Sequence, residues 1–178
     1  VWWEQNAKMH SKNFWNLYNA ASTPWIWHKE LFKTAKKYNL EIFSSPFDES
    51  AVEFLERLKC PAYKIASPEI NHIPLIKKVA KTGKPVILST GLADLKDIKL
   101  AIKTLKRNGC KKIAVLQCVS SYPAPIAEQN LKVITDIKKK FKVLSGLSDH
   151  TMGNTSALTS VAMGGSIVEK HFNTSEKT

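Results

Sequence analysis

Hydrophobic residues in most of the chain come in short runs that alternate with longer amphipathic stretches. The runs are rich in Ile, Val and Leu and lack a regular alternation with polar residues. This pattern is typical of strands that are buried on both faces of a parallel sheet. We therefore predict parallel strands in six runs, namely residues 41–45, 62–66, 85–90, 112–118, 142–146 and 166–170.

Helical patterns fill the intervals between these runs. Ser50 and Glu53 have the spacing of a capping box, which predicts a helix that begins near this point. Asp94 can cap a helix over residues 95–107, and Gly109 stands where a C-terminal glycine is expected. The strand starts recur at intervals of roughly 20–30 residues, the length of a compact strand–helix unit. With further helices predicted over residues 74–82, 128–140 and 154–163, the alternation indicates an α/β fold with a parallel sheet.

Two α/β architectures compete, an open doubly wound sheet and a closed barrel. No G-x-G-x-x-G motif follows the first predicted strand, so the dinucleotide-binding form of the open sheet lacks its main support. Polar residues instead follow nearly every predicted strand, and a site built from many strand ends is typical of a (β/α)8 TIM barrel. These residues are Ser44, Ser45, Lys64, Ser67, Ser89, Thr90, Ser120, Ser121, Ser148, Asp149, His150, Glu169 and His171.

The chain is shorter than a complete barrel of this type, which takes about 250 residues. We therefore expect an incomplete TIM barrel in which about six of the eight strands are present. Residues 41–178 would supply strands three to eight. Residues 1–40 differ in character, with helical patterns over residues 13–21 and 25–38, and we predict that they form a helical lead-in segment of the barrel.

The composition is that of an ordinary globular protein, with 43% hydrophobic and 24% charged residues. The longest apolar runs are too short to span a bilayer, so we expect no membrane partner. Three cysteines without a C-x-x-C pair argue against a disulfide framework and for a reducing compartment. The composition therefore favours a cytoplasmic protein.

The net charge of +12 is the unusual bulk feature. Many of the lysines fall within predicted helices, such as residues 95–107 and 128–140, where they would form solvated outer faces. A non-catalytic basic fragment that binds anions or nucleic acid stays open as an alternative of another class. No nucleic-acid recognition motif accompanies the charge, so we do not predict a nucleic-acid partner.

Two histidines follow short apolar runs, His150 after Ser-Asp and His171 after Glu-Lys. If the two runs are neighbouring barrel strands, both imidazoles lie over the mouth of the barrel. Two histidine ligands, with the other positions filled by water, suit a divalent metal ion that acts as a Lewis acid. The spacing of 21 residues is no metal motif in itself, so a structural or surface role for each histidine stays open.

A lysine and several serines form a second group of candidate site residues. A cation and several hydroxyl groups that converge on one mouth make a receptor for a phosphate and a carboxylate. Each serine taken alone is as well explained by helix capping, but serines in successive loops beside a lysine favour anion binding. The group comprises Lys64, Ser67, Ser89, Ser120 and Ser148.

Several motifs of the chain, in order along about 130 residues, resemble those of the sialic acid synthase family. They are FSSPFD at 43–48, PAYKIAS at 61–67, GKP at 83–85 with LSTG at 88–91, YP at 122–123, GLSDHT at 146–151 and EKHF at 169–172. The resemblance implies the TIM barrel already favoured by the strand pattern. It also implies a transferase that forms a carbon–carbon bond between phosphoenolpyruvate and an amino sugar.

The resemblance implies a role for each candidate residue. His150 and His171 would hold a divalent metal ion, Mn²⁺ or Mg²⁺, and would act in catalysis together with Lys64. The phosphoenolpyruvate-binding positions would be Lys64, Ser67, Ser89 and Ser148, together with Ser120, which stands where the family has Asn.

The family's mechanism and architecture add further expectations. The metal would polarise the aldehyde of the open-chain sugar, C3 of phosphoenolpyruvate would attack it, and water would capture C2 before phosphate leaves by C–O cleavage. A full-length family member would be a homodimer. A glutamate and a lysine on the first two strands would lie upstream of Val1, and an antifreeze-like domain would lie downstream of Thr178.

Within the family, the segment from residue 17 to 32 resembles that of the pseudaminic acid synthases. The similar positions are LY at 17–18, TPW at 23–25, WH at 27–28 and LF at 31–32. The expected sugar is then 2,4-diacetamido-2,4,6-trideoxy-L-altrose, for a bacterial surface glycan. Pro68 departs from the subgroup, which usually carries Phe there, and N-acetylneuraminate and legionaminic acid synthases stay open as alternatives.

Overall fold

The computed structural model describes residues 22–172, which fall into two compact units. Residues 41–171 form the larger unit, and residues up to 40 belong to the other. The described part of the smaller unit contains helix α3 (Trp25–Lys37), which confirms the helix predicted over residues 25–38. The helix predicted over residues 13–21 lies outside the described residues, and the assignment of residues 1–40 as a lead-in segment stays a prediction.

The larger unit is built on a sheet of five parallel strands in the order β1-β2-β3-β4-β5. Each strand pairs with the next one along the chain, so every connection is a single strand–helix–strand crossover. The strands are β1 (Tyr63–Ile65), β2 (Val86–Ser89), β3 (Ile113–Cys118), β4 (Leu144–Asp149) and β5 (Ile167–Lys170).

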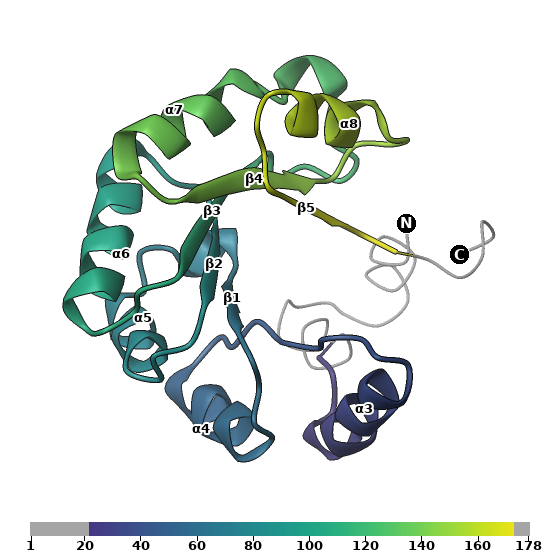
Figure 1. Cartoon of the computed structure of the whole chain (residues 1–178), viewed down its shortest axis with the longest axis vertical. Helices are drawn as coiled ribbons and strands as arrows, with labels where there is room; N and C mark the ends of the chain where they lie inside the picture. Colours follow the sequence, from purple (N-terminus) through teal and green to yellow (C-terminus); the bar gives the residue numbers. More distant parts are fainter. Residues whose placement is uncertain (1–21, 173–178) are drawn as a thin grey trace, which may run out of the picture. The chain divides into compact units, whose positions relative to one another are not determined.

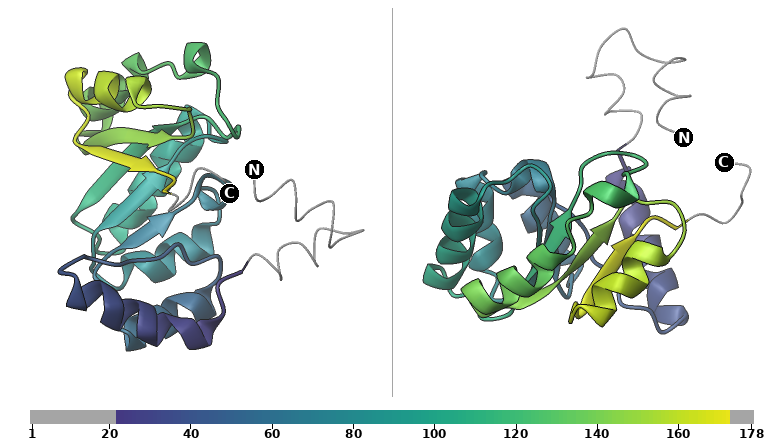
Figure 2. Two further views of the ribbon diagram at one scale, coloured as in Figure 1. Left: turned by 90° about the vertical axis from the view of Figure 1, so that its right-hand side faces the viewer. Right: turned by 90° about the horizontal axis from the view of Figure 1, so that it is seen from above.

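The helices of this unit decide between the two architectures. In Figure 1 the sheet is curved, and the helices that follow β1 to β4 lie on its convex side. Figure 2 shows the same strands from their concave side. A doubly wound sheet carries helices on both faces, whereas a barrel carries them outside only, so the arrangement is that of a partial barrel. The helices are α4 (Glu49–Arg57), α5 (Ile73–Ala80), α6 (Leu95–Arg107), α7 (Lys132–Phe141) and α8 (Thr155–Ala162), with short 3-10 turns η1 (Ser67–Glu69) and η2 (Ile126–Glu128).

The predicted strand over residues 41–45 is not a strand in the structure. Ser44 makes only an isolated parallel bridge to Tyr63, so the described residues contain five strands and the expected six are not confirmed. The strand predicted over residues 142–146 begins and ends later, at Leu144 and Asp149. Lys142 is the C-cap of α7 with a φ of 53°, a left-handed conformation that ends a helix and does not fit a strand.

The helix cap predicted at Asp94 is confirmed, and the one predicted at Ser50 is wrong. Asp94 caps α6 in a capping box, and Gly109 follows the helix with a φ of 99°, as predicted. The predicted box of Ser50 and Glu53 is wrong, because Asp48 is the N-cap of α4. The Asp48 carboxylate accepts hydrogen bonds from the Ala51 amide at 2.8 Å and the Ser50 hydroxyl at 2.7 Å. An ionised carboxylate at the helix N-terminus is favoured there by the helix dipole.

Successive side chains of each strand point to opposite faces of the sheet. One face packs against the helices and forms the core, and the other, concave face carries the candidate site residues. Tyr63, Ile65 and Leu88 are fully buried and face the helices. Lys64 lies between the first two of these and therefore points to the concave face. Because the strands are in register, residues that share a rung share a face, and the last concave rung of β3–β5 contains Cys118, Ser148 and Glu169.

Candidate active site

An ion pair joins the two edge strands of the sheet across its concave face. The ammonium group of Lys64 on β1 lies 2.6 Å from both carboxylate oxygens of Glu169 on β5. The Ser148 hydroxyl on β4 donates to Oε1 of the same carboxylate at 2.6 Å. Lys64 is only 8% exposed. A buried charge needs a partner, and the Glu169 carboxylate is the partner of this ammonium group. The structure thus brings together two of the predicted anion-binding residues, Lys64 and Ser148.

Glu169 stays ionised at this site although it is partly buried. Burial on its own would raise the pKa of the carboxyl, but the hydrogen bonds from Lys64 and Ser148 outweigh it and lower the pKa below its ordinary value. Glu169 was not among the predicted site residues. The signal was its place two residues before His171, since residues at that spacing on a strand point to the same face.

The two predicted histidines lie side by side at the ends of β4 and β5. The ring centroids of His150 and His171 are 5.4 Å apart. Tyr122 stacks on His150 with a centroid distance of 4.1 Å and meets His171 edge-on at 5.5 Å. Tyr122 was part of a recognised Tyr-Pro motif without an assigned role, and its aromatic ring now forms one wall of the histidine pair.

The protonation of the two rings differs. Burial would lower the pKa of His150, but its contacts with Cys118 and the Val119 carbonyl raise it overall. Nδ1 of His150 lies 2.9 Å from the Val119 carbonyl oxygen, which assigns the proton to Nδ1 and leaves Nε2 as the free nitrogen. Burial and the neighbouring His150 lower the pKa of His171, which favours its neutral form. Only a neutral imidazole binds a metal ion, so His171 is in the binding form, whereas a metal at Nε2 of His150 would replace the proton that its raised pKa favours.

The histidine pair fits part of a metal site. Among residues 22–172 no group of three or more His, Cys, Asp or Glu side chains is placed to hold a metal ion. Two adjacent imidazoles with free nitrogens nevertheless fit a divalent ion whose remaining positions are filled by water or substrate. His150 and His171 are therefore the residues that would hold such an ion.

The other predicted serines gather around Gly91, just after β2. The Ser67 hydroxyl oxygen accepts a hydrogen bond from the Gly91 amide at 3.0 Å, so its own proton can be donated to the Cys118 sulfur or to a ligand. A β-carbon added to Gly91 would collide with the Ser120 hydroxyl and would lie 3.0 Å from the Cys118 sulfur and 3.1 Å from the Ser67 hydroxyl. An alanine at this point would therefore force the Ser120 hydroxyl to move.

Ser89 is the predicted residue without a visible partner. Its side chain is 2% exposed, and its hydroxyl finds no hydrogen-bond partner within the described part of the chain. A buried hydroxyl without a partner costs about 1–3 kcal/mol, so such groups in native proteins often mark a ligand or an ordered water. The position at the C-terminal end of β2, beside the Gly91 loop, suits a ligand group at the barrel mouth.

Cys118, the last residue of β3, lies beside one of the two histidines. Its sulfur lies 4.0 Å from Nδ1 of His150. Burial would raise the pKa of the thiol, but its contacts with His150 and Ser67 outweigh burial and lower the pKa overall. Cys118 is therefore a polar member of the site. The other two cysteines, Cys60 and Cys110, are buried, and burial raises the pKa of each thiol, as expected for inert core residues.

If the predicted substrate is phosphoenolpyruvate, we expect Gly91→Ala in the full-length protein to lower kcat/KM for it about tenfold to a hundredfold, because a displacement of about 1 Å in a catalytic site has an effect of this order. The added methyl group would push against the hydroxyls of Ser67 and Ser120. Gly83→Ala is the matched control, since a β-carbon there meets nothing within 4 Å although φ is 70°. Steady-state kinetics and thermal melts of both variants test this. A kinetic loss in Gly83→Ala as large as in Gly91→Ala would contradict the prediction.

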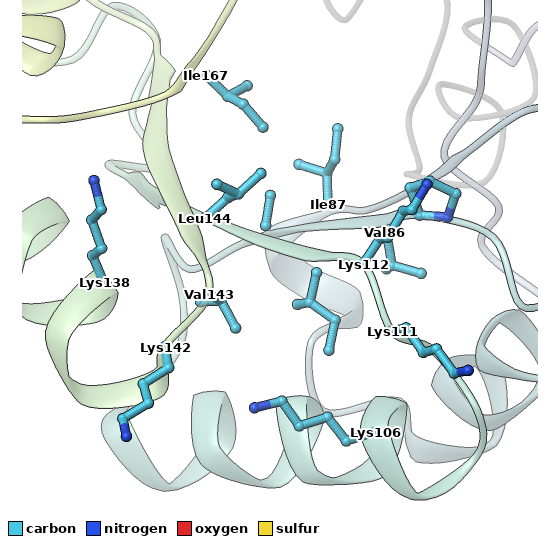
Figure 3. Close-up of a pocket in the computed structure, with 13 residues that line it drawn as sticks. Val86, Ile87, Lys106, Lys111, Lys112, Lys138, Lys142, Val143, Leu144 and Ile167 are labelled. Atoms are coloured by element: carbon cyan, nitrogen blue, oxygen red, sulfur yellow. The ribbon is translucent and has the colours of Figure 1, made fainter.

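A hollow of about 700 Å³ lies at the opposite, amino-terminal end of the strands. Figure 3 shows its floor of apolar side chains, among them Val86, Leu144 and Ile167, and the lysines around it. These three residues are at the starts of their strands, away from the histidines. Because neither carboxylates nor hydroxyls line it, this hollow lacks the groups that the predicted chemistry needs, and we place the site at the carboxyl ends of the strands.

Comparison with known proteins gives a family match over nearly the whole chain. The sequence model of the NeuB family matches residues 2–178. Pseudaminic acid synthase of Helicobacter pylori is 45% identical over 168 residues, which are 94% of this chain and 49% of that protein. N,N'-diacetyllegionaminic acid synthase of Campylobacter jejuni is 46% identical over 147 residues, 82% of this chain and 44% of that protein. The chain thus spans about half the length of the curated relatives it matches.

A solved structure agrees with the fold. The crystal structure of N-acetylneuraminic acid (sialic acid) synthetase from Leptospira borgpetersenii, in complex with citrate, superposes with a TM-score of 0.88 at 30% identity. The superposition covers 97% of this chain and 60% of that chain. As for membranes, the described part of the chain contains no helix with the length and apolar character that a membrane crossing requires.

Proposed function

Because this chain belongs to the NeuB family, we propose that its protein is a nonulosonic acid synthase that condenses phosphoenolpyruvate with an amino sugar and releases phosphate. The observation that carries the proposal is the convergence of Lys64, four serine hydroxyls and two adjacent histidines on one end of a parallel barrel sheet. This combination supplies an anion receptor and two metal-binding nitrogens within one mouth.

Phosphoenolpyruvate would bind through its phosphate and carboxylate. Lys64 offers a buried cation, and Glu169 holds it extended across the mouth. Ser67 keeps a hydroxyl proton to donate, and Ser89 has a buried hydroxyl without a partner. Ser120 and Ser148 complete the set from the ends of β3 and β4. These groups would fix the ligand and stabilise the charge that develops on it.

The reaction then proceeds by addition and elimination at C2. C3 of phosphoenolpyruvate attacks the aldehyde carbon of the open-chain sugar, which forms the new C–C bond and leaves positive charge on C2. The aldehyde oxygen takes up a proton and becomes a hydroxyl, and water adds to C2 with loss of one proton. The C2–O bond to the phosphate then breaks, and the C2 hydroxyl gives up its proton to the phosphate, which yields the keto acid and inorganic phosphate. When bound, the divalent ion supplies Lewis-acid polarisation of the aldehyde oxygen. His150 and His171 would hold that ion, and Lys64 would keep the departing phosphate paired with a cation.

For the sugar, we propose 2,4-diacetamido-2,4,6-trideoxy-L-altrose, which would make the protein a pseudaminic acid synthase. The support is the resemblance of residues 17–32 and the longer match to the pseudaminic enzyme, 168 residues against 147. Identity alone does not decide, since the legionaminic relative is 46% identical and the pseudaminic one 45%. A legionaminic or N-acetylneuraminate synthase is the second candidate.

Phosphate release by the full-length gene product tests both levels of the proposal. The assay contains Mn²⁺, phosphoenolpyruvate and one of three sugars, the altrose above, the legionaminic precursor or N-acetylmannosamine. Release with the altrose alone supports the pseudaminic assignment. Release with another sugar keeps the synthase and overturns the subgroup, and no release with any of them overturns the synthase.

We extend the same proposal to the setting of the protein. The family resemblance supports a homodimer of the full-length protein, with phosphoenolpyruvate and an amino sugar as its partners, and the three unpaired cysteines support the cytoplasm. The alternative of a basic nucleic-acid-binding fragment predicts binding that falls steeply with salt. Binding of a DNA or RNA oligonucleotide that follows such a salt dependence would favour that alternative.

A further inference from the structure

A second ion pair lies directly behind the histidines, on the opposite face of the sheet. The ammonium group of Lys170 is 2.7 Å from Oδ2 of Asp149. Asp149 immediately precedes His150, and Lys170 immediately precedes His171. The Asp149 side chain is fully buried and the Lys170 side chain is 29% exposed. The pair therefore faces away from the predicted substrate but is covalently adjacent to both metal-binding candidates.

Three successive rungs connect β4 to β5 at this end. The first is the hydrogen bond from Ser148 to Glu169 at 2.6 Å on the concave face. The second is the ion pair of Asp149 with Lys170, which are register partners. The third is the pair of histidine rings, whose centroids are 5.4 Å apart. The ion pair thus occupies the last paired rung of the two strands, and the spacing of the histidines depends on how firmly that rung is held.

Further hydrogen bonds tie the same ion pair to the chain beyond His150. The other carboxylate oxygen of Asp149, Oδ1, accepts hydrogen bonds from the Thr151 amide at 2.9 Å and from the Thr151 hydroxyl at 2.7 Å. Lys170 also donates to the Thr151 carbonyl oxygen at 2.7 Å. The ion pair therefore links Asp149, the residue before His150, to Thr151, the residue after it, and so restrains the backbone from which the His150 ring extends.

We propose that Asp149 and Lys170 are positioning residues that hold His150 and His171 at the separation needed to share one divalent metal ion. The inference rests on the proposed function for the presence of that ion. The observations behind it are the place of Asp149 and Lys170 directly before the two histidines, their pairing on the last rung of β4 and β5, and their shared bonds to Thr151. Groups that hydrogen-bond to the ligand rings themselves are worth roughly tenfold to a hundredfold in metal affinity, and Asp149 and Lys170, which act through the backbone, should reach the lower end of that range.

The test is Mn²⁺ binding to the full-length protein, followed by the electron paramagnetic resonance signal of free Mn²⁺. Lys170→Met keeps the side-chain length but removes the charge, and we expect it to weaken Mn²⁺ binding about tenfold. Lys170→Arg, which restores a cation at the same place, should recover most of the affinity. Asp149→Asn provides a second variant, since it weakens the same pair while it keeps the shape of the buried side chain.

The matched control is Lys84→Met. Lys84 is 26% exposed and pairs with Glu56 on α4, so its loss removes a similar ion pair that has no contact with the histidines. We expect Lys84→Met to bind Mn²⁺ as the unmodified protein does. Equal Mn²⁺ affinity in Lys170→Met and Lys84→Met would overturn the positioning role, and so would failure of Lys170→Arg to recover affinity.

The outcomes also separate this inference from the proposed function. Loss of Mn²⁺ binding in Lys170→Met, in a protein that releases no phosphate with any sugar, would keep the positioning role and overturn the synthase. Phosphate release by the unmodified protein with unchanged Mn²⁺ binding in Lys170→Met would keep the synthase and overturn the positioning role. No binding of Mn²⁺ by the unmodified protein would overturn the positioning role.

Discussion

Lys64→Met is expected to lower kcat/KM for phosphoenolpyruvate about a hundredfold to a thousandfold, the range seen when one preorganised charge-stabilising donor is removed. Lys64 is the buried cation of the mouth, 8% exposed and bound to Glu169. Without it the phosphate and carboxylate of the ligand would meet the Glu169 carboxylate directly. Like charges in a water-poor site repel strongly, so both ligand binding and the departure of phosphate should suffer. Steady-state kinetics of the full-length protein measures the effect.

Two further variants make the Lys64 result specific. Lys84→Met removes the lysine of the ion pair with Glu56 of α4, away from the candidate site. It should leave kcat/KM close to that of the unmodified protein. Lys64→Arg keeps the charge but replaces a compact ammonium by a planar guanidinium, so we expect only partial recovery. A kcat/KM in Lys64→Met within a few-fold of the Lys84→Met value would show that Lys64 does not bind the substrate.

His150→Ala is expected to abolish Mn²⁺ binding and to lower kcat about a thousandfold or more, because a Lewis acid supplies several kcal/mol of stabilisation in such reactions. The variant leaves His171 as a single imidazole, which does not hold an ion firmly. His72→Ala is the control, since His72 is an exposed residue at the start of α5, outside the site. Calorimetric titration with Mn²⁺ and phosphate release are measured on the same preparations.

The His150 prediction is contradicted if the variant binds Mn²⁺ with the affinity of the His72→Ala control. Activity that persists in His150→Ala at saturating Mn²⁺ would mean that the ion is held by other residues. Loss of activity with unchanged Mn²⁺ binding would instead assign His150 to the substrate. Thermal melts of both variants ensure that the comparison is between folded proteins.

The parallel sheet could be predicted from the sequence because its strands are buried on both faces. Runs such as residues 112–118 have no polar alternation, and β3 is found there as Ile113–Cys118. The run at residues 41–45 has only Ile42 and Phe43 as hydrophobic residues and makes only the bridge from Ser44 to Tyr63. Strand formation depends on the neighbour that pairs with the run, and composition does not contain that information.

Site residues that directly follow a strand could be predicted from the sequence. Residues whose role depends on a contact between distant strands could not. His150 and His171 were paired from their places after apolar runs, and their rings are neighbours. Glu169 was missed because its role arises from an ion pair with Lys64, a residue 105 positions away. Such a contact follows from the curvature of the sheet and the alignment of its two edge strands, neither of which a single sequence reveals.

The most direct test of the central claim follows the oxygen atom that bridges C2 and phosphorus in phosphoenolpyruvate. Substrate labelled with ¹⁸O at this position is incubated with the full-length protein, Mn²⁺ and each of the three sugars, and the released phosphate is analysed by mass spectrometry. The proposed reaction predicts sugar-dependent release of phosphate that retains the ¹⁸O label, since the C–O bond breaks. Unlabelled phosphate, or release that does not depend on a sugar, would contradict a synthase and indicate simple phosphoester hydrolysis.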